Sequence, residues 1–358
     1  WALATEDETV RRELLTDSGY MSGFQQLYPS VQPNWAGYFV RQDWVDASGV
    51  GQMETYEDWE TFLAWVKANT DSTGLFLNST TGQQGIIMAG LNASAGMLQE
   101  NNQLYFSPIT NEYKDYLALI SDWYAKGYVD KDFSSNNAFA QMGNFTSGDY
   151  GLFWHMYTYR DLLENMGREN NPDFTVAAVQ APVQNRGDKI LVNPGMLDSR
   201  LGGQRASISA TCENPELLTQ WYDYLYSEEG AFLCNFGIEG EAYNMVDGKI
   251  VLTDALVHNP NGWAYGEVMN LYIMPSYFPY YYDWGREAYS GISEAAQECC
   301  NVWFDCWDIP NQKSISSYVS LTTEESESIS SRYTDINTLV QEFTSKVIIG
   351  EESLDNWD

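Results

Sequence analysis

The chain has 358 residues, of which 18 are basic and 50 acidic, so its formal net charge at pH 7 is −32. A surface this acidic repels phosphate backbones, which excludes nucleic acid as a partner, and a hydrophobic content of 44% excludes a disordered chain. The length predicts two lobes or domains, because a single hydrophobic core stops growing at about 250–300 residues.

Four helices are predicted from caps and apolar periodicity. Thr55 and Asp58 form a capping-box pattern, followed by apolar residues at helical spacing as far as Val66. A second helix opens near Asn111 and stops at Gly127.

The third predicted helix has Asn214 as N-cap and Pro215 at its first position, and Gly230 ends it. The fourth covers 324–346. Its expected inward residues are Ile329, Tyr333, Ile336, Leu339, Val340 and Phe343. Short strands are predicted at 37–40, 150–153, 174–179 and 206–210. Helices that alternate with isolated short strands predict an α/β architecture.

Sequence motifs for covalent chemistry are absent. No nucleophile elbow, phosphate-binding glycine loop or H-E-x-x-H pattern occurs. The five cysteines cannot all pair, and those at 299, 300 and 306 lack the usual spacing of a zinc site. We therefore expect no catalytic residues, no cofactor and no metal. The 50 acidic residues leave a two-carboxylate glycan hydrolase open as an alternative.

Aromatic residues make up 15% of the chain, with 13 Trp, 25 Tyr and 15 Phe. Such a content in an acidic, loop-rich chain favours a stacking surface, above all for sugars.

Four phrases occur in order along most of the chain. They are Y-F-V-R-Q-D-W-V at 38–45 with T-Y-E-D-W at 55–59, F-T-S-G-D-Y-G at 145–151, the segment from N-P-E at 214–216 through 222–230 to N-F-G-I-E-G-E at 235–241, and K-V-I-I-G at 346–350 with L-D-N-W at 354–357. Together they resemble the extracellular solute-binding proteins (family 1) of carbohydrate ABC transporters, most closely the long lipoprotein branch with alginate- and oligosaccharide-binding members.

This resemblance implies an α/β, two-lobe periplasmic-binding-protein-like fold with a hinge and a central cleft. The expected N-terminal lobe comprises 1–38 and 206–275 and is expected to be incomplete in this chain, and the expected C-terminal lobe comprises 39–205 and 276–358. Many long-branch members carry a calcium loop where this chain has 69–76. That stretch holds one carboxylate, so no calcium is expected there.

The resemblance also implies that flat aromatic rings stack on a sugar in the cleft. Trp154, after the second predicted strand, and Trp284, after an aromatic run, are the expected stacking rings, with core packing as the alternative for Trp154. His155 and Tyr157 share the loop of Trp154, and His155 has a structural role as its alternative.

The remaining candidate ligand-binding residues lie elsewhere in the sequence. Tyr281 belongs to the aromatic run before Trp284, and Trp35 and Trp263 lie in proline-containing loops where packing is the alternative. Arg205 precedes the strand predicted at 206–210, which the resemblance places in the hinge. There it could bind hydroxyls or a uronate, or be solvated or ion-paired.

The expected function is that of the substrate-binding component of an ABC importer, which captures an oligosaccharide by hinge closure and delivers it to the membrane permease. We expect a monomer, extracellular and anchored as a lipoprotein, without catalysis. The acidic surface favours a neutral sugar over alginate. Alternatives are a binding protein for peptides or another non-sugar solute, a glycan-active hydrolase and an adhesive surface protein.

Overall fold

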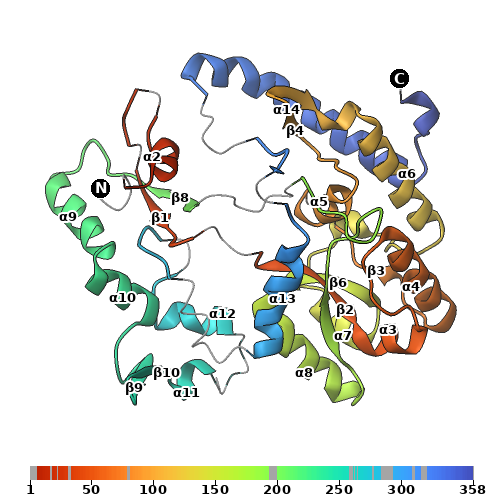
Figure 1. Cartoon of the computed structure of the whole chain (residues 1–358), viewed down its shortest axis with the longest axis horizontal. Helices are drawn as coiled ribbons and strands as arrows, with labels where there is room; N and C mark the ends of the chain where they lie inside the picture. The colour runs from red at the N-terminus through yellow and green to blue at the C-terminus, as the bar shows by residue number, and fades with distance from the viewer. Residues whose placement is uncertain are drawn as a thin grey trace. The chain divides into compact units, whose positions relative to one another are not determined.

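The computed structural model describes residues 6–16, 18–21, 23–30, 34–78, 81–192, 200–257, 261, 263, 265–275, 278–283, 293–308, 311–315 and 321–357. It divides into two compact units (Figure 1). Unit 1 comprises Trp1–Gln32, Leu197–Gln297 and Ser316–Thr322, and unit 2 comprises Pro33–Met196, Glu298–Ile315 and Thr323–Asp358.

Unit 2 contains most of the secondary structure. Its elements are β2 (Ala36–Arg41), α3 (Gln42–Ser48), α4 (Tyr56–Asn69), β3 (Gly74–Leu75), α5 (Thr81–Ala89), β4 (Met97–Glu100), β5 (Gln103–Phe106), η1 (Ser107–Ile109), α6 (Asn111–Ala125), η2 (Phe133–Ser135), α7 (Met142–Ser147), β6 (Tyr150–Met156), η3 (Tyr157–Tyr159), α8 (Arg160–Asn170), β7 (Val176–Val179), α13 (Glu294–Asp305) from Glu298 onward, α14 (Thr323–Ile348) and η7 (Leu354–Asn356).

The sheet of unit 2 has the strand order β3-β6-β2-β7, in which β2 runs antiparallel to both β6 and β7 and β3 runs parallel to β6. Every residue of β2 is buried. Tyr38 faces the main core with Trp59, whereas Phe39 faces Trp303 of α13 on the other side of the sheet. The two faces of β2 are therefore covered by different helices, which explains its continuous apolar run.

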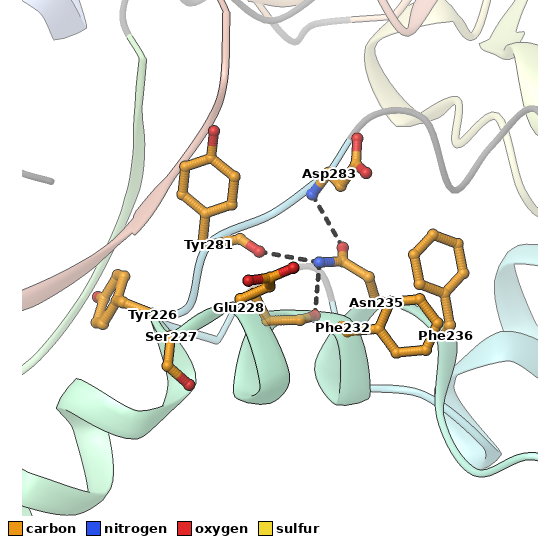
Figure 2. Close-up of a pocket in the computed structure, with 9 residues that line it drawn as sticks. Tyr226, Ser227, Glu228, Phe232, Asn235, Phe236, Tyr281 and Asp283 are labelled. Carbon is orange, nitrogen blue, oxygen red and sulfur yellow. Dashed lines mark hydrogen bonds between the residues drawn. The ribbon is translucent and has the colours of Figure 1, made fainter.

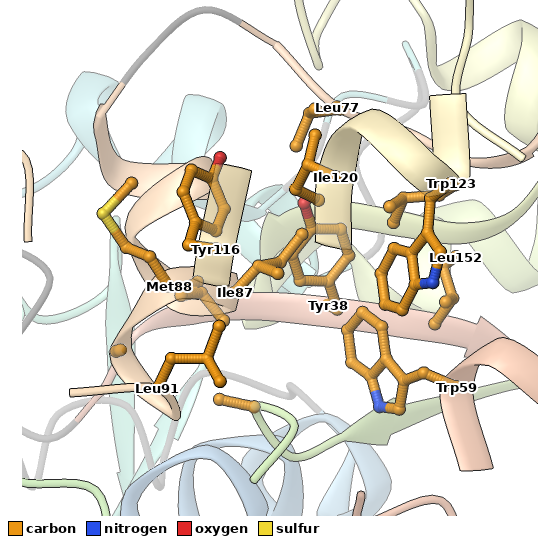
Figure 3. Packing of buried hydrophobic residues seen from close by; sticks show 14 of the residues in the cluster. Tyr38, Trp59, Leu77, Ile87, Met88, Leu91, Tyr116, Ile120, Trp123 and Leu152 are labelled. Carbon is orange, nitrogen blue, oxygen red and sulfur yellow. The ribbon is translucent and has the colours of Figure 1, made fainter. Parts of the chain in front are cut away.

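The main core of unit 2 is one large cluster of buried aromatic and aliphatic side chains (Figure 3). Trp59, Phe62 and Trp123, contributed by α4 and α6, are fully buried there. Burial of a side chain such as Phe62 stabilises the folded state by roughly 1.5–3 kcal/mol relative to exposure. The sheet of unit 2 is thus supported by a continuous core.

Helix caps confirm two of the predicted helices. The predicted capping box of α4 is present, with Thr55 accepting from the backbone of Asp58 and the Asp58 carboxylate accepting in return. Helix α6 begins at Asn111, but its side-chain cap is Thr110. Gly127 follows α6 in the left-handed conformation, as its position in the sequence indicated.

Unit 1 is built from shorter elements. They are α2 (Glu8–Leu14), β1 (Phe24–Leu27), β8 (Leu201–Ala206), α9 (Pro215–Leu225), α10 (Glu228–Phe236), β9 (Tyr243–Val246), β10 (Lys249–Leu252), α11 (Asp254–Val257), α12 (Tyr265–Val268) and η4 (Met269–Leu271). In the described part of unit 1, β1 pairs with β8 and β9 pairs with β10, each antiparallel. The buried residues that the structure describes in unit 1 form separate small clusters.

The expected C-terminal lobe includes 276–358, and the described residues 278–283 of that range belong to compact unit 1. Hydrogen bonds account for the difference. The backbone N–H of Tyr282 donates to the carbonyl of Leu27 at 2.8 Å, and the N–H of Leu27 donates to the carbonyl of Tyr280 at 3.0 Å. The segment around Tyr281 therefore lies against β1.

The third predicted helix was wrong at its end. Helix α9 ends at Leu225, and Gly230 lies inside a second helix, α10, whose N-cap is Ser227. A Cβ at Gly230 would lie 1.9 Å from the carbonyl oxygen of Tyr224. Glycine is therefore needed because α10 starts in close contact with the end of α9, and not because a helix stops there.

Other predicted details also need correction. Strand β6 extends to Met156, and β8 covers Leu201–Ala206, not 206–210. On α14 only part of the predicted inward stripe is covered: Val340 and Phe343 pack on the core, but Ile329, Tyr333 and Ile336 are exposed, as is Leu339. Within the described residues, no helix combines the length and the apolarity that crossing a membrane requires.

Candidate functional site

Unit 2 brings two of the predicted stacking residues together at one end of its sheet. Trp35 precedes β2 and Trp154 lies near the end of β6; because these strands are antiparallel, with Ala36 opposite Met156, both residues lie at the same end. Their ring centroids are 6.4 Å apart at an interplanar angle of 74°, an edge-to-face contact.

Tyr157 joins the same sheet end, since its backbone N–H donates to the carbonyl of Trp35 at 3.1 Å. Trp35 is 38% exposed, whereas Trp154 and Tyr157 are half-buried. The indole Nε1 of Trp154 is buried and has no hydrogen-bond partner among the described residues. We call Trp35, Trp154 and Tyr157 the sheet-end aromatic group. It offers an apolar indole surface on a strand fixed by the main core.

His155 points to the opposite face of the strand and is fully buried. Its ring lies 4.8 Å from that of Phe139 and 4.3 Å from that of Tyr159, and its Nδ1 accepts the backbone N–H of Met156 at 2.9 Å. Burial lowers the pKa of His155 to about 4. This placement fits a neutral structural histidine, which was the alternative for His155.

Unit 1 contains a pocket of about 380 Å³ beside α10 (Figure 2). We call it the α10 pocket. It is lined by Tyr226, Ser227, Glu228, Ala231, Phe232, Asn235, Phe236, Tyr281 and Asp283. Of these, only Tyr281 was predicted as a site residue. Its half-buried side chain shares the pocket with Phe232, which is 40% exposed, so this pocket also offers aromatic surface.

Asn235 holds one wall of the α10 pocket in place. Its amide nitrogen donates to the carbonyls of Ala231 at 2.8 Å and Tyr281 at 2.9 Å, and its amide oxygen accepts the backbone N–H of Asp283 at 3.0 Å (Figure 2). Asn235 is 3% exposed. Asn235 therefore clamps the backbone on both sides of Tyr282 to helix α10.

The lining residues taken from α10 share one face of the helix. Glu228, Ala231, Phe232, Asn235 and Phe236 follow the spacing i, i+3, i+4, i+7, i+8. This spacing was visible in the sequence. The prediction ended its third helix at Gly230 and therefore did not include this face of α10.

The other predicted site residues are placed outside both groups or are not described. Arg205 is exposed on β8 opposite Gln25, and Trp263 is 50% exposed; neither lines the α10 pocket. Trp284 lies outside the described residues.

No group of three or more His, Cys, Asp or Glu residues that could hold an ion occurs among the described residues. The turn inside 69–76 is held by protein atoms: the Ser72 hydroxyl donates to the carbonyl of Asp149 at 2.7 Å and accepts the N–H of Gly74 at 2.9 Å. Cys299 and Cys306 are buried, which raises the pKa of both thiols to about 12.

Solved structures with this architecture are solute-binding proteins. The alginate-binding protein AlgQ2, in a crystal structure without calcium ion, matches with a TM-score of 0.78 at 18% identity, covering 100% of this chain and 74% of its own. The chain has the solute-binding-protein fold.

Two further structures with this solute-binding-protein fold match at 14% identity. One is an HMO-binding, ABC-transporter-associated protein from Bifidobacterium longum infantis, with a TM-score of 0.73 over 99% of this chain and 75% of its own. The other is the substrate-binding protein FusA of S. pneumoniae in complex with kestose, with a TM-score of 0.74 and the same coverage. The resemblance found in the sequence is confirmed by these neighbours.

The solute-binding-protein fold is established by the structure and not by sequence comparison. No protein-family model matches the sequence, and no curated protein matches it.

Proposed function

We propose that this protein is the substrate-binding component of an ABC importer and that its ligand is an oligosaccharide. The observation that carries the proposal is the contact of Trp35 with Trp154 at one sheet end of a chain with this fold. Neighbours of that fold are named for binding alginate and HMO, and one is solved with kestose.

The proposed chemistry is binding without covalent change. A sugar ring has an apolar C–H face, which the indole surfaces of Trp35 and Trp154 can cover, and a rim of hydroxyls that side-chain amides and carboxylates can bind. Stacking of this kind requires rings held in fixed positions, because ordering a mobile ring costs binding free energy. Trp154 meets this requirement because β6 is paired with β2 as far as Met156 and the Trp154 side chain packs against the main core.

The α10 pocket is proposed as a second sugar-binding group, within unit 1. It combines the aromatic rings of Phe232 and Tyr281 with the carboxylates of Glu228 and Asp283. Asn235 serves it as a positioning residue.

The partners and location follow from the same proposal. The neighbours are named as ABC-transporter proteins, which supports a membrane permease as the partner that receives the sugar. We propose an extracellular monomer attached to the cell membrane by a lipid anchor, as the sequence resemblance implies.

A thermal-shift screen tests the function. The panel contains malto-, manno-, cello- and fructo-oligosaccharides, oligouronates and short peptides. A ligand at 100 times its dissociation constant stabilises the folded protein by about 2.7 kcal/mol. For a unit of about 200 residues this corresponds to an increase of roughly 5–10 °C in melting temperature.

The expected result is a shift with one class of glycan and none with peptides. A shift with peptides alone would mean that the ligand is a peptide, and release of smaller sugars from a bound oligosaccharide would indicate a hydrolase. Either result would contradict the proposal.

A further inference from the structure

The α10 pocket has a distinctive charge. Two of its lining residues, Glu228 and Asp283, are acidic, and no Lys, Arg or His occurs among the residues that line it. Glu228 lies in the centre of the close-up, with Tyr226 and Tyr281 on one side and Phe232 and Phe236 on the other (Figure 2). A ring that enters this space meets aromatic surface and a carboxylate together.

The start of helix α10 lies in the same pocket, and a helix N-terminus ordinarily favours anions because its first N–H groups are unpaired. Here the hydroxyl of Ser227 already accepts the N–H of Gly230 at 3.1 Å. Glu228 and Glu229 place two carboxylates in the first turn, against a helix-end charge of about half a unit. The local charge at this helix end is therefore negative.

The pocket's own carboxylates decide which ligand it accepts, more than the net charge of −32. At 0.15 M salt the Debye length is about 8 Å, so charges elsewhere on the surface are largely screened. A carboxylate that lines the pocket lies within that length of any ring bound there.

We infer that the α10 pocket takes a sugar ring without an acid group and that Glu228 excludes uronic acids from it. The inference rests on the proposed function and defines the substrate class of this site. Hydroxyl groups donate to the Glu228 carboxylate while the C–H face of the ring covers Phe232, whose ring lies 4.9 Å from that of Phe236. A uronate places a second carboxylate where a hydroxyl donor is needed.

A matched pair of glycans tests the inference by isothermal titration calorimetry at 0.15 M salt. The probes are the tightest-binding neutral oligosaccharide among the malto-, manno- and cello- series and the same glycan after oxidation of its primary hydroxyls to carboxylates. The oxidised glycan is expected to bind at least tenfold more weakly, a difference of about 1.4 kcal/mol.

Two single-charge variants separate the pocket from the rest of the surface. Glu228→Gln removes the lining carboxylate. The ratio of the dissociation constants of the oxidised and the neutral glycan, at least tenfold in the wild type, is expected to fall at least threefold in this variant. Glu229→Gln removes the same charge one residue further along α10, outside the lining, and the ratio is expected to fall less than in Glu228→Gln.

Each other outcome overturns the inference. Equal binding of both glycans, or preference for the oxidised one, overturns it while the proposed function stands. A ratio that is unchanged in Glu228→Gln, or that falls equally in both variants, removes Glu228 as the cause. If neither these glycans nor any in the screen binds, the proposed function itself fails.

Discussion

The two units of this chain bury their apolar side chains in different ways. Unit 2 places a sheet between helices and buries Trp59, Phe62 and Trp123 in one large core. In the described part of unit 1 the buried side chains are distributed among separate small clusters, and α9 buries Leu225 while Trp221 remains 43% exposed. Among the described residues, the core of unit 2 is therefore one cluster, whereas the buried side chains of unit 1 lie in several.

The same contrast applies to the two proposed sugar-binding groups. The sheet-end aromatic group is fixed by strand pairing and by the core beneath Trp154. The α10 pocket keeps Tyr281 in place through the backbone clamp of Asn235. We therefore expect substitutions in the core of unit 2 to affect global stability, and single hydrogen bonds in unit 1 to affect the site directly.

The largest expected effect is on the core of unit 2. Trp59→Ala should lower the free energy of unfolding by about 3–5 kcal/mol, because it leaves a cavity in a fully packed cluster. The Trp59 indole N–H has no partner among the described residues, so the loss is one of packing. Trp221→Ala in unit 1 should lower the free energy of unfolding by less than about 1 kcal/mol. Equal losses of unfolding free energy for the two variants in urea denaturation would contradict this contrast between the units.

Loss of the side-chain hydrogen bonds of Asn235 should affect unit 1. Asn235→Ala loses three hydrogen bonds and is expected to destabilise unit 1 by about 2–3 kcal/mol, at roughly 1 kcal/mol for each bond. Hydrogen exchange at residues 280–283 should accelerate, while exchange in β2 and β6 stays unchanged. Unaltered exchange at 280–283 would mean that other contacts hold this segment.

The buried histidine makes the stability of unit 2 depend on pH. The pKa of His155 is about 4 in the folded state, below the unfolded value of about 6.5, so the unfolded state binds the proton first as the pH falls. Stability is retained above pH 6.5 and is lost between pH 6.5 and 4, by about 2 kcal/mol at pH 5. The His155→Phe variant should lack this pH-dependent part of the unfolding free energy. Identical pH profiles of both proteins would contradict the buried neutral state.

Two buried cysteines report local opening of the two units. Cys234 lies in unit 1 and Cys306 in unit 2, and they are 3% and 5% exposed. In moderate urea, Cys234 should be alkylated about tenfold faster than Cys306, as measured by mass spectrometry. This ratio corresponds to a difference of about 1.4 kcal/mol in the free energy of local opening. Faster modification of Cys306 would reverse the ranking of the units.

The sequence predicted those parts of the fold whose signals are local. The capping box at Thr55 and Asp58 depends on residues three apart, and the structure shows it as expected. Gly230 misled the prediction because a glycine required by close contact with Tyr224 resembles a helix stop. The exposed first half of the α14 stripe shows that periodicity identifies an apolar face without identifying what covers it.

The candidate site was predictable in part for the same reason. Trp35 and Trp154 were both proposed from the sequence, but their contact depends on the antiparallel register of β2 with β6. The predicted strand ended at 153, whereas β6 continues to Met156, and alternation along the strand places His155 on the face opposite Trp154. Asn235 acts on backbone groups 46 and 48 residues away, so no local pattern could indicate its role.

Sugar binding at the sheet-end aromatic group is the central claim, and one calorimetric titration tests it most directly. The oligosaccharide selected by the thermal-shift screen is titrated into the wild type, Trp154→Ala and Trp221→Ala, with Trp35→Ala as a second, more exposed site variant. Trp154→Ala should weaken binding by about 2 kcal/mol or more, roughly 30-fold, and Trp221→Ala should bind as the wild type does. Wild-type affinity in both Trp154→Ala and Trp35→Ala would contradict the account.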